Sequence, residues 1–364
     1  MPTVDEEFLL HLLQACAARA PEPLYPAHYA REQHLDRDTL DAGLDELRRR
    51  GLVHLTEWIK DAGQGLALTD AGRRALASER VPIERAVVSN APAPKAGALT
   101  EYERGEIVRA AIFEPTRPFV SRALLAANLL YFVFGAFYAG NNGLDVSHYL
   151  AGSSPAPDFT THIVLIKLGA LHTSLVFPLG TRPEFERIIL SCFLHIGVLH
   201  LFMNMFFLYS LGPIIESMWG SLRFLAIYFI AGIVGGCAVL HFDMTQEHSA
   251  YVAGASGCLF GIFVALVVWF MLNRQFLPER LIQAFKNNLA TNVILLVAVN
   301  FLPNVSWQGH LGGAIGGLLA ALLLHVQRFH PSPAIRFLAL AGVPIIPIGF
   351  LVAVLWEAHQ AGFL

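Results

Sequence analysis

Long stretches without a single Asp, Glu, Lys or Arg constrain this chain more than any other feature of its sequence. Six such intervals occur, at 123–144, 188–215, 224–242, 248–273, 287–327 and 337–356. A helix that crosses the hydrocarbon core of a bilayer needs ~20 apolar residues, and each interval is about that long or longer. Because apolar residues make up 55% of the 364-residue chain, disordered, collagen-like and coiled-coil structures are excluded.

The fifth interval, 287–327, is about twice as long as one spanning helix, and Pro303-Asn304 interrupts it. It therefore predicts two spans, which brings the total to seven. Backbone amides in hydrocarbon must be paired within the protein, and these runs are too long for strands, so helices are predicted throughout. The predicted spans are 123–140, 188–211, 223–242, 252–272, 288–302, 309–327 and 337–356.

Lys and Arg in the connecting segments predict the orientation, because short cytoplasmic loops carry an excess of positive charge. Three of them, Lys167, Arg182 and Arg187, fall on one side of the membrane. Ten fall on the side of the N-terminus: Arg104, Arg109, Arg117, Arg122, Arg223, Arg274, Arg280, Lys286, Arg328 and Arg336. We therefore expect a multi-pass protein of the plasma (inner) membrane, with the N-terminus cytoplasmic, the C-terminus outside and no signal peptide.

The first ~100 residues differ in kind, with 12 Lys and Arg against 15 Asp and Glu. Their apolar pattern predicts a helix, a second helix, a hairpin and a third helix. These elements cover 7–18, 40–50, 52–55 paired with 66–68, and 70–77. Asp38 and Thr39 are the candidate caps of the second helix, and Gly51 ends it.

This order of elements resembles a winged-helix domain, with 44–53 similar to the end of its second helical unit and 66–76 similar to its wing. A small α+β cytoplasmic domain is therefore predicted over 1–87, followed by a linker and juxtamembrane segment over 88–120. Many such domains bind DNA. Here the helix that would enter the groove carries Asp41, Asp45 and Glu46, so contact with protein or a regulatory role is favoured over nucleic acid.

The connection between the first two predicted spans is too long for a simple turn. Within it, 162–177 alternates apolar runs with His162, Lys167 and His172, which suits a segment at the membrane interface. Packing is favoured over substrate contact as its role.

Polar side chains inside membrane spans are costly, so each one needs a reason. The second predicted span carries His195, His200 and Asn204. At 100° per residue, His200 and Asn204 lie about 40° apart on one helical face, whereas His195 and Asn204 lie about 180° apart. His195 is therefore interpreted as a packing or interfacial histidine.

The fourth and sixth predicted spans each carry glycines at every fourth position, which leaves one strip of each helix without side chains. These strips consist of Gly257 and Gly261 on one helix and of Gly309, Gly313 and Gly317 on the other. Small residues at this spacing let two helices approach closely. Because Ser256 and His310 lie beside the strips, we expect the hydroxyl and the imidazole to come within hydrogen-bond reach.

A serine beside a histidine is the minimum for nucleophilic catalysis, since the imidazole accepts the hydroxyl proton during attack and returns it to the leaving amine. The intervals that hold Ser256 and His310 contain no acid, so a dyad is predicted, with Ser256 as nucleophile and His310 as general base and acid. The side chains of His200 and Asn204 and the backbone N–H of Ser256 are the candidate donors to the developing oxyanion.

Three motifs together resemble the rhomboid family of intramembrane serine proteases over about 120–330. They are His200-x-x-x-Asn204, Gly254-Ala255-Ser256-Gly257 and Gly309-His310-Leu311-Gly312-Gly313. The resemblance implies six core helices and cleavage of the transmembrane segments of other proteins near the outer face. The predicted fold is an all-α polytopic membrane protein, with a rhomboid-like six-helix core over 121–330 and a seventh C-terminal transmembrane helix over 331–364.

Two positions depart from the pattern of the family. Glu186-Arg187 stands where many members have Trp-Arg, and Phe260 keeps an aromatic ring on the histidine without a hydroxyl. Neither change removes a catalytic atom. Phe260 is therefore grouped with the supporting residues, which also include Gly254, Gly257, Gly309 and Gly313.

Two alternatives stay open beside the protease: a catalytically inactive rhomboid-like scaffold that binds membrane proteins, and a membrane-tethered DNA-binding regulator. An inactive relative would be expected to lose the serine or the histidine, and both are present.

The predicted partners are transmembrane protein substrates and the lipid bilayer. No metal, nucleotide or other cofactor is expected, because no ligand cluster or phosphate loop is present. The cysteines lie far apart and are interpreted as packing residues: Cys16, Cys192, Cys237 and Cys258.

Overall fold

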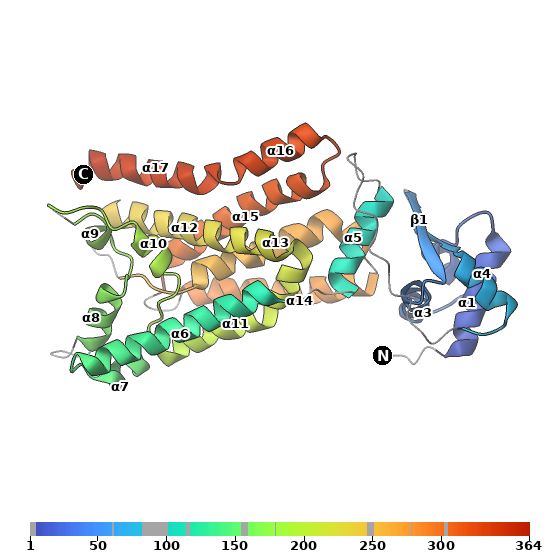
Figure 1. Cartoon of the computed structure of the whole chain (residues 1–364), viewed down its shortest axis with the longest axis horizontal. Helices are drawn as coiled ribbons and strands as arrows, with labels where there is room; N and C mark the ends of the chain where they lie inside the picture. Colours follow the sequence, from blue (N-terminus) through green and yellow to red (C-terminus); the bar gives the residue numbers. More distant parts are fainter. Residues whose placement is uncertain are drawn as a thin grey trace. The chain divides into compact units, whose positions relative to one another are not determined.

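The computed structural model of the chain is mostly helical with one small sheet, as the sequence predicts (Figure 1). It divides into two compact units. The first contains Met1–Ala110, Asn273–Asn288 and Pro331–Pro333, and the second contains the rest. The structure describes residues 5–59, 62–81, 101–113, 117–153, 159–178, 180–245, 251–277, 279–301 and 305–364.

The first unit contains the predicted helices and hairpin near the N-terminus. Its elements are α1 (Glu6–Arg19), α2 (Pro26–Glu32), α3 (Arg37–Arg49), β1 (Val53–Ile59), β2 (Gly63–Leu68), α4 (Asp70–Ala77) and α5 (Glu101–Phe113). The strands pair antiparallel, with Val53 opposite Leu68. Helix α2 was not predicted, because seven residues are too few to show a helical period. Of the predicted linker and juxtamembrane segment over 88–120, residues 88–100 lie outside the described residues, whereas 101–113 form α5.

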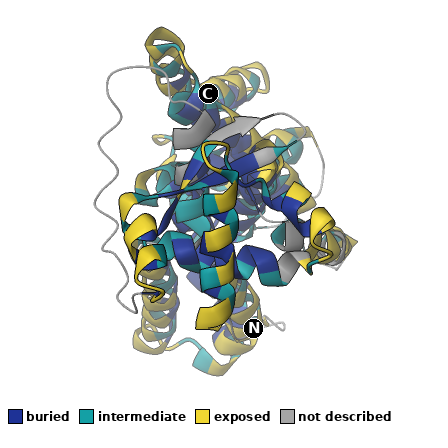
Figure 2. Cartoon of the chain, turned by 90° about the vertical axis from the view of Figure 1, so that its right-hand side faces the viewer, coloured by how far each residue is buried: buried dark blue, intermediate teal, exposed yellow. Residues whose placement is uncertain are grey.

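The predicted cap of α3 was wrong by a few residues. Asp36 caps this helix, and its carboxylate accepts a hydrogen bond from the backbone N–H of Thr39 at 2.9 Å. A core of leucines then joins α1 to α3. Buried side chains of this core include Leu9, Leu12, Leu13, Leu40, Leu44 and Leu47. Figure 2 shows the resulting separation, with dark blue buried residues inside and yellow exposed residues on the outward sides of the helices.

Six of the described helices of the chain are long and apolar enough to cross a membrane. They are α6 (Phe119–Asn141), α11 (Gly197–Trp219), α12 (Ser221–Thr245), α13 (Ser256–Asn273) extended by η1 (Arg274–Phe276), α15 (Trp307–Phe329), and α16 (Pro333–Gly342) continued by α17 (Ile345–Gln360). The last predicted span is thus interrupted at Val343-Pro344, where proline supplies no backbone N–H to the helix. The chain is a multi-pass membrane protein.

The remaining predicted span falls in α14 (Glu279–Ala298) and η2 (Val299–Phe301), whose first half carries Glu279, Arg280 and Lys286. In the sequence, α14 connects α13 to α15, and these two helices run in the same direction. A Cβ on Gly257 would lie 3.1 Å from the carbonyl oxygen of Gly309, and one on Gly317 would lie 2.4 Å from the Cα of Gly261. Because both helices begin at the same end, the chain must return between them, and α14 is the segment that does so.

Large apolar side chains face outward from the helices of the second unit, as expected for contact with lipid. On α6, Leu130 is 69% exposed, and on α11 Leu199 is 75% exposed. Trp356 of α17 is 65% exposed. A water-soluble protein rarely exposes contiguous apolar surface of this kind.

The second predicted span begins later than expected. Residues 186–190 form the short helix α10 (Glu186–Leu190), and α11 does not start until Gly197. Gly197 has a φ of +77°, and a Cβ there would lie 2.6 Å from the backbone nitrogen of Gly152. This close approach requires glycine and fixes the point at which the helix begins.

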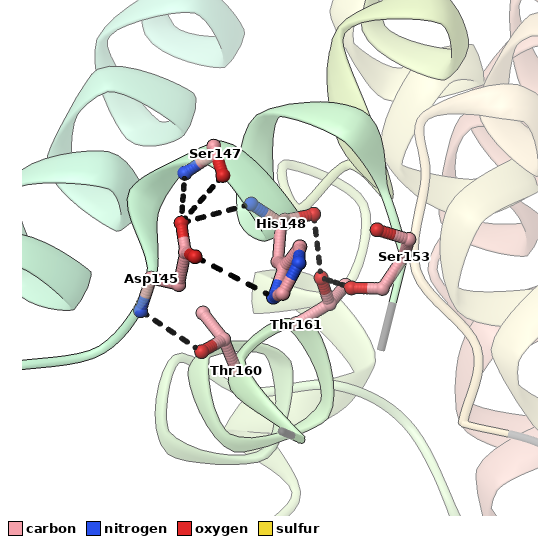
Figure 3. A network of polar contacts seen from close by, with 6 residues as sticks. All are labelled: Asp145, Ser147, His148, Ser153, Thr160 and Thr161. Carbon is pink, nitrogen blue, oxygen red and sulfur yellow. Dashed lines mark hydrogen bonds and ion pairs between the residues drawn. The ribbon is translucent and has the colours of Figure 1, made fainter. Parts of the chain in front are cut away.

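The long connection between α6 and α11 is folded rather than extended. It contains α7 (Val146–Ala151), α8 (Thr160–Lys167) and α9 (Thr173–Val176). Figure 3 shows how Asp145 caps α7, accepting hydrogen bonds from the backbone and hydroxyl of Ser147 at 2.8 and 2.6 Å. The Ser147 hydrogen bonds lower the pKa of the Asp145 carboxyl. The backbone N–H of Asp145 donates to the hydroxyl of Thr160, and the hydroxyl of Thr161 donates to the carbonyl of His148.

The segment predicted to lie at the interface packs inward over much of its length. Val164, Leu165 and Val176 are fully or almost fully buried, and Leu171 pairs with Val252 in an isolated β-bridge. This bridge attaches the connection to the residues that precede α13, close to Ser256.

Candidate active site

Ser256 is the first residue of α13, and the glycine before it shapes its surroundings. Gly254 has a φ of +133°, and its N–H donates to the carbonyl of Ser191 at 2.8 Å. A Cβ at this position would lie 2.7 Å from Cε1 of His200, so only glycine lets that ring lie against the backbone beside the serine. The N–H of Ser256 belongs to the first turn of a helix, where backbone donors have no partner inside the helix.

The glycine strips of α13 and α15 face each other. A Cβ on Gly313 would lie 2.1 Å from the carbonyl oxygen of Gly257, and one on Gly261 would lie 2.8 Å from the carbonyl oxygen of Gly313. A side chain at any of these positions would force the two backbones apart. Because of this close contact, the beginning of α15 lies next to the beginning of α13.

His310 lies in the first turn of α15. The hydroxyl of Ser306 caps this helix by accepting from the N–H of Gly309 at 3.3 Å. Nε2 of His310 lies 2.8 Å from Oγ of Ser256. The Phe260 ring stacks on the imidazole, with the ring centroids 4.2 Å apart and the planes at 11°. The histidine is buried, with Phe260 against one face of its ring and Ser256 at one edge.

His200 and Asn204 lie on the same face of α11, as their spacing predicts. Because the backbone N–H of Ile196 donates to Nδ1 of His200 at 3.3 Å, the hydrogen of the neutral ring is on Nε2. Nδ2 of Asn204 donates one hydrogen to the carbonyl of His200 at 2.9 Å. The ring of His200 lies against Gly254, next to the serine.

The prediction for His195 assumed that it lies on the same helix as His200 and Asn204. That assumption was wrong, because His195 precedes the start of α11. It is fully buried, its Nδ1 lies 3.2 Å from the carbonyl of Phe193, and its ring centroid is 5.2 Å from that of His200. It therefore packs beside His200.

Sequence reasoning missed one polar neighbour of His310. Oδ1 of Asn300 lies 2.7 Å from Nδ1 of the histidine. The available sequence signal was an isolated asparagine near the end of a predicted span, ten residues before His310. Among the described residues, no three His, Cys, Asp or Glu side chains form a group that could hold a metal ion.

Comparison with known proteins gives the family. A model of the Rhomboid domain matches residues 182–327. Rhomboid protease GluP of Bacillus subtilis (strain 168) is 29% identical over 233 residues, which is 63% of this chain and 39% of GluP. RHOMBOID-like protein 5 of Arabidopsis thaliana is 33% identical over 171 residues, 46% of this chain and 53% of that protein. The rhomboid-named protein YdcA of Bacillus subtilis (strain 168) is 32% identical over 141 residues, 38% of this chain and 67% of YdcA. The chain belongs to the rhomboid family.

The rhomboid family includes intramembrane proteases that act on membrane proteins within the bilayer. The part of the chain that matches the family model, 182–327, runs from just before α10 almost to the end of α15. It contains Ser256, His310 and both residues of the His200–Asn204 pair. The chain spans about two fifths of the length of GluP and about half that of RHOMBOID-like protein 5.

Proposed function

We propose that this rhomboid is an active serine endopeptidase that cleaves transmembrane segments of other membrane proteins by a Ser256–His310 dyad. The observation that carries the proposal is the 2.8 Å contact between Oγ of Ser256 and Nε2 of His310 at the adjoining ends of two helices. A hydroxyl is a weak nucleophile at neutral pH, and a base at this distance can remove its proton during attack.

In the first half of the proposed reaction, Oγ of Ser256 attacks the carbonyl carbon of the scissile peptide bond as its proton passes to Nε2 of His310. The tetrahedral intermediate then collapses, and the carbon–nitrogen bond breaks. His310 returns the proton to the leaving amine, so an acyl-enzyme ester on Ser256 and one free peptide remain. In the second half, water loses a proton to His310, attacks the ester and releases the acid, and Oγ recovers its hydrogen.

The negative charge on the attacked oxygen needs donors that are already in place. Nε2–H of His200, the second amide hydrogen of Asn204 and the backbone N–H of Ser256 are the proposed donors. Two observations support this assignment. The tautomer of His200 leaves Nε2 as the donor, and its ring lies against Gly254 beside the serine. Loss of one such donor costs about 2.7–4 kcal/mol in a well-formed oxyanion hole.

Water and substrate are proposed to reach the dyad near the outer face of the plasma membrane. The excess of Lys and Arg on the side of the N-terminus supports a cytoplasmic N-terminus, which puts the beginnings of α13 and α15 toward the outside. A substrate helix would enter sideways from the lipid and unwind near its outer end. It would then present a small residue to Ser256.

A fluorophosphonate probe, which reacts with activated serines, tests the proposal on the full-length protein in detergent or liposomes. We expect the wild type to be labelled, Ser256→Ala to be unlabelled, and His310→Ala to lose labelling while its thermal unfolding stays close to that of the wild type. Asn204→Ala should slow proteolysis without abolishing labelling. Labelling that persists in Ser256→Ala would refute the proposal and favour an inactive scaffold.

A further inference from the structure

Both ring nitrogens of His310 have a side-chain partner. Nε2 lies 2.8 Å from Oγ of Ser256, and Nδ1 lies 2.7 Å from Oδ1 of Asn300. A neutral imidazole carries one hydrogen, so its partners decide which nitrogen donates and which accepts. The contact with Asn300 therefore bears directly on whether Nε2 is free to act as a base.

The amide of Asn300 is oriented by a second hydrogen bond. Its Nδ2 donates to the carbonyl oxygen of Leu296, one turn earlier, at 2.7 Å. An amide nitrogen can only donate and an amide oxygen can only accept, so this bond turns Oδ1 toward the histidine. Nδ1 of His310 must then carry the hydrogen that Oδ1 accepts. Nε2 is left with a lone pair that faces the hydroxyl of Ser256.

The same contact remains favourable after the proton moves. When Nε2 takes the serine proton, the imidazolium is a donor at both nitrogens, and the bond from Nδ1–H to Asn300 becomes charge-assisted and stronger. A carboxylate would provide a stronger acceptor, but an isolated charge at membrane depth is costly. The interval 287–327, which holds both residues, contains no acid. An amide oxygen supplies an acceptor there without that cost.

The place of Asn300 in the fold suits this role. It lies in η2, at the end of the segment that returns from α13 to α15, whereas His310 is in the first turn of α15. Phe260 covers the face of the imidazole and Asn300 holds its edge. Two elements other than the helix of His310 thus fix the ring.

We propose that Asn300 is a positioning residue that holds His310 in the tautomer and orientation required for deprotonating Ser256, so that a Ser–His–Asn set replaces a simple dyad. This inference rests on the proposed function, since it concerns the same reaction. It adds a residue from α14 and η2, a segment that supplies none of the groups assigned above to the reaction.

The test compares fluorophosphonate labelling rates of full-length variants. Asn300→Leu keeps the size of the side chain but removes the acceptor, and Asn300→Asp restores one. Asn142→Leu is the matched control, because the amide of Asn142 makes the same bond to a carbonyl four residues earlier, that of Tyr138 at 2.8 Å, outside the site. For Asn300→Leu we expect a ten- to hundredfold fall in the maximal labelling rate, with an unchanged probe concentration for half-maximal rate. Asn300→Asp should regain at least part of that loss, and Asn142→Leu should match the wild type.

The outcomes separate this inference from the proposed function. If Ser256→Ala is unlabelled but Asn300→Leu reacts at the wild-type rate, the positioning role is wrong and the proposed function stands. An equal loss in Asn300→Leu and Asn300→Asp would also overturn the role, since it would show that the acceptor is not what matters. If Ser256→Ala is still labelled, the proposed function and the positioning role are both wrong. Should Asn300→Leu fail to fold by thermal unfolding, Asn300→Ala takes its place with the same expected loss.

Discussion

At the scale of single residues, the candidate site depends on how the His310 ring is held as much as on the atoms that react. Phe260 lies one helical turn after Ser256 on α13 and stacks on the imidazole with the planes at 11°. Its ring restrains rotation of the histidine without offering a hydrogen bond. Stacked aromatic pairs contribute about 0.5–1.5 kcal/mol beyond the area that they bury.

The contribution of this ring is testable with Phe260→Leu, which keeps apolar volume and removes the stacking. We expect the labelling rate of Ser256 to fall about two- to tenfold, the equivalent of the stacking energy, because the imidazole is less often in the reactive orientation. Phe260→Tyr keeps the ring and should stay near the wild-type rate. A wild-type rate in Phe260→Leu would show that packing around His310 needs no aromatic ring.

A second residue-scale prediction concerns the thiol of Cys16, which is buried in α1. Burial raises its pKa to about 12. Because the thiolate is the reactive form, only about 10⁻⁴ of this group is ionised at pH 8 in the folded state. Iodoacetamide should therefore leave Cys16 unmodified at pH 8 until denaturant is added, as followed by mass spectrometry of its peptide. The raised pKa also means that this group favours folding below pH ~9 and that the benefit is lost as the pH rises toward 12. Rapid modification of the native protein at pH 8 would contradict the burial.

At the scale of helices, the contact of α13 with α15 permits no side chain in its strip. A Cβ on Gly313 would lie 2.1 Å from the carbonyl oxygen of Gly257, where neither backbone can give way without moving a whole helix. We expect Gly313→Ala to reduce fluorophosphonate labelling by at least tenfold, because it moves His310 away from Ser256. Gly349→Ala is the matched control, since a Cβ there meets nothing within 4 Å. Equal labelling of both variants would show that the glycine strips do not position His310 beside Ser256.

The start of α6 depends on a carboxylate from another helix. Glu216 of α11 is fully buried and accepts from the N–H groups of Val120 and Ser121 at 2.9 and 2.8 Å. Glutamine would place an amide NH2 against one of these donors. We therefore expect Glu216→Gln to reduce stability by about 1.5–3 kcal/mol, seen as a lower thermal unfolding midpoint in detergent. Glu357→Gln, which removes an exposed partner of His241, should cost at most ~1 kcal/mol. Similar midpoints for the two variants would exclude the capping role.

The spacing of small and polar residues predicted the helices that carry the candidate site, because a strip without side chains has few other uses in a membrane. The same spacing placed the start of α11 too early. The helix begins at Gly197 because the backbone there lies against Gly152, 45 residues earlier, and the sequence does not show this contact. Asn300 was missed for a similar reason. One asparagine among apolar residues can bond its own helix, and only the folded chain shows that its oxygen faces His310.

At the scale of the whole molecule, the number of crossings decides on which side of the membrane the chain ends. Six described helices are apolar enough to span, and an even number would put both termini on the same side. The parallel course of α13 and α15 favours a crossing by α14 as well, although its first half is charged. We therefore expect seven crossings, which would put the two termini on opposite sides.

Reporter fusions distinguish the two counts in living cells. Green fluorescent protein fluoresces on the cytoplasmic side, and alkaline phosphatase is active outside. We expect fluorescence from fusions before Met1 and after His330, which follow zero and six crossings, and phosphatase activity from a fusion after Leu364, which follows seven. If α14 did not cross, the fusion after His330 would become the external one and that after Leu364 the cytoplasmic one. That exchange would also contradict the contact of Ser256 with His310, because two helices separated by an uncrossed connection would begin on opposite faces of the membrane.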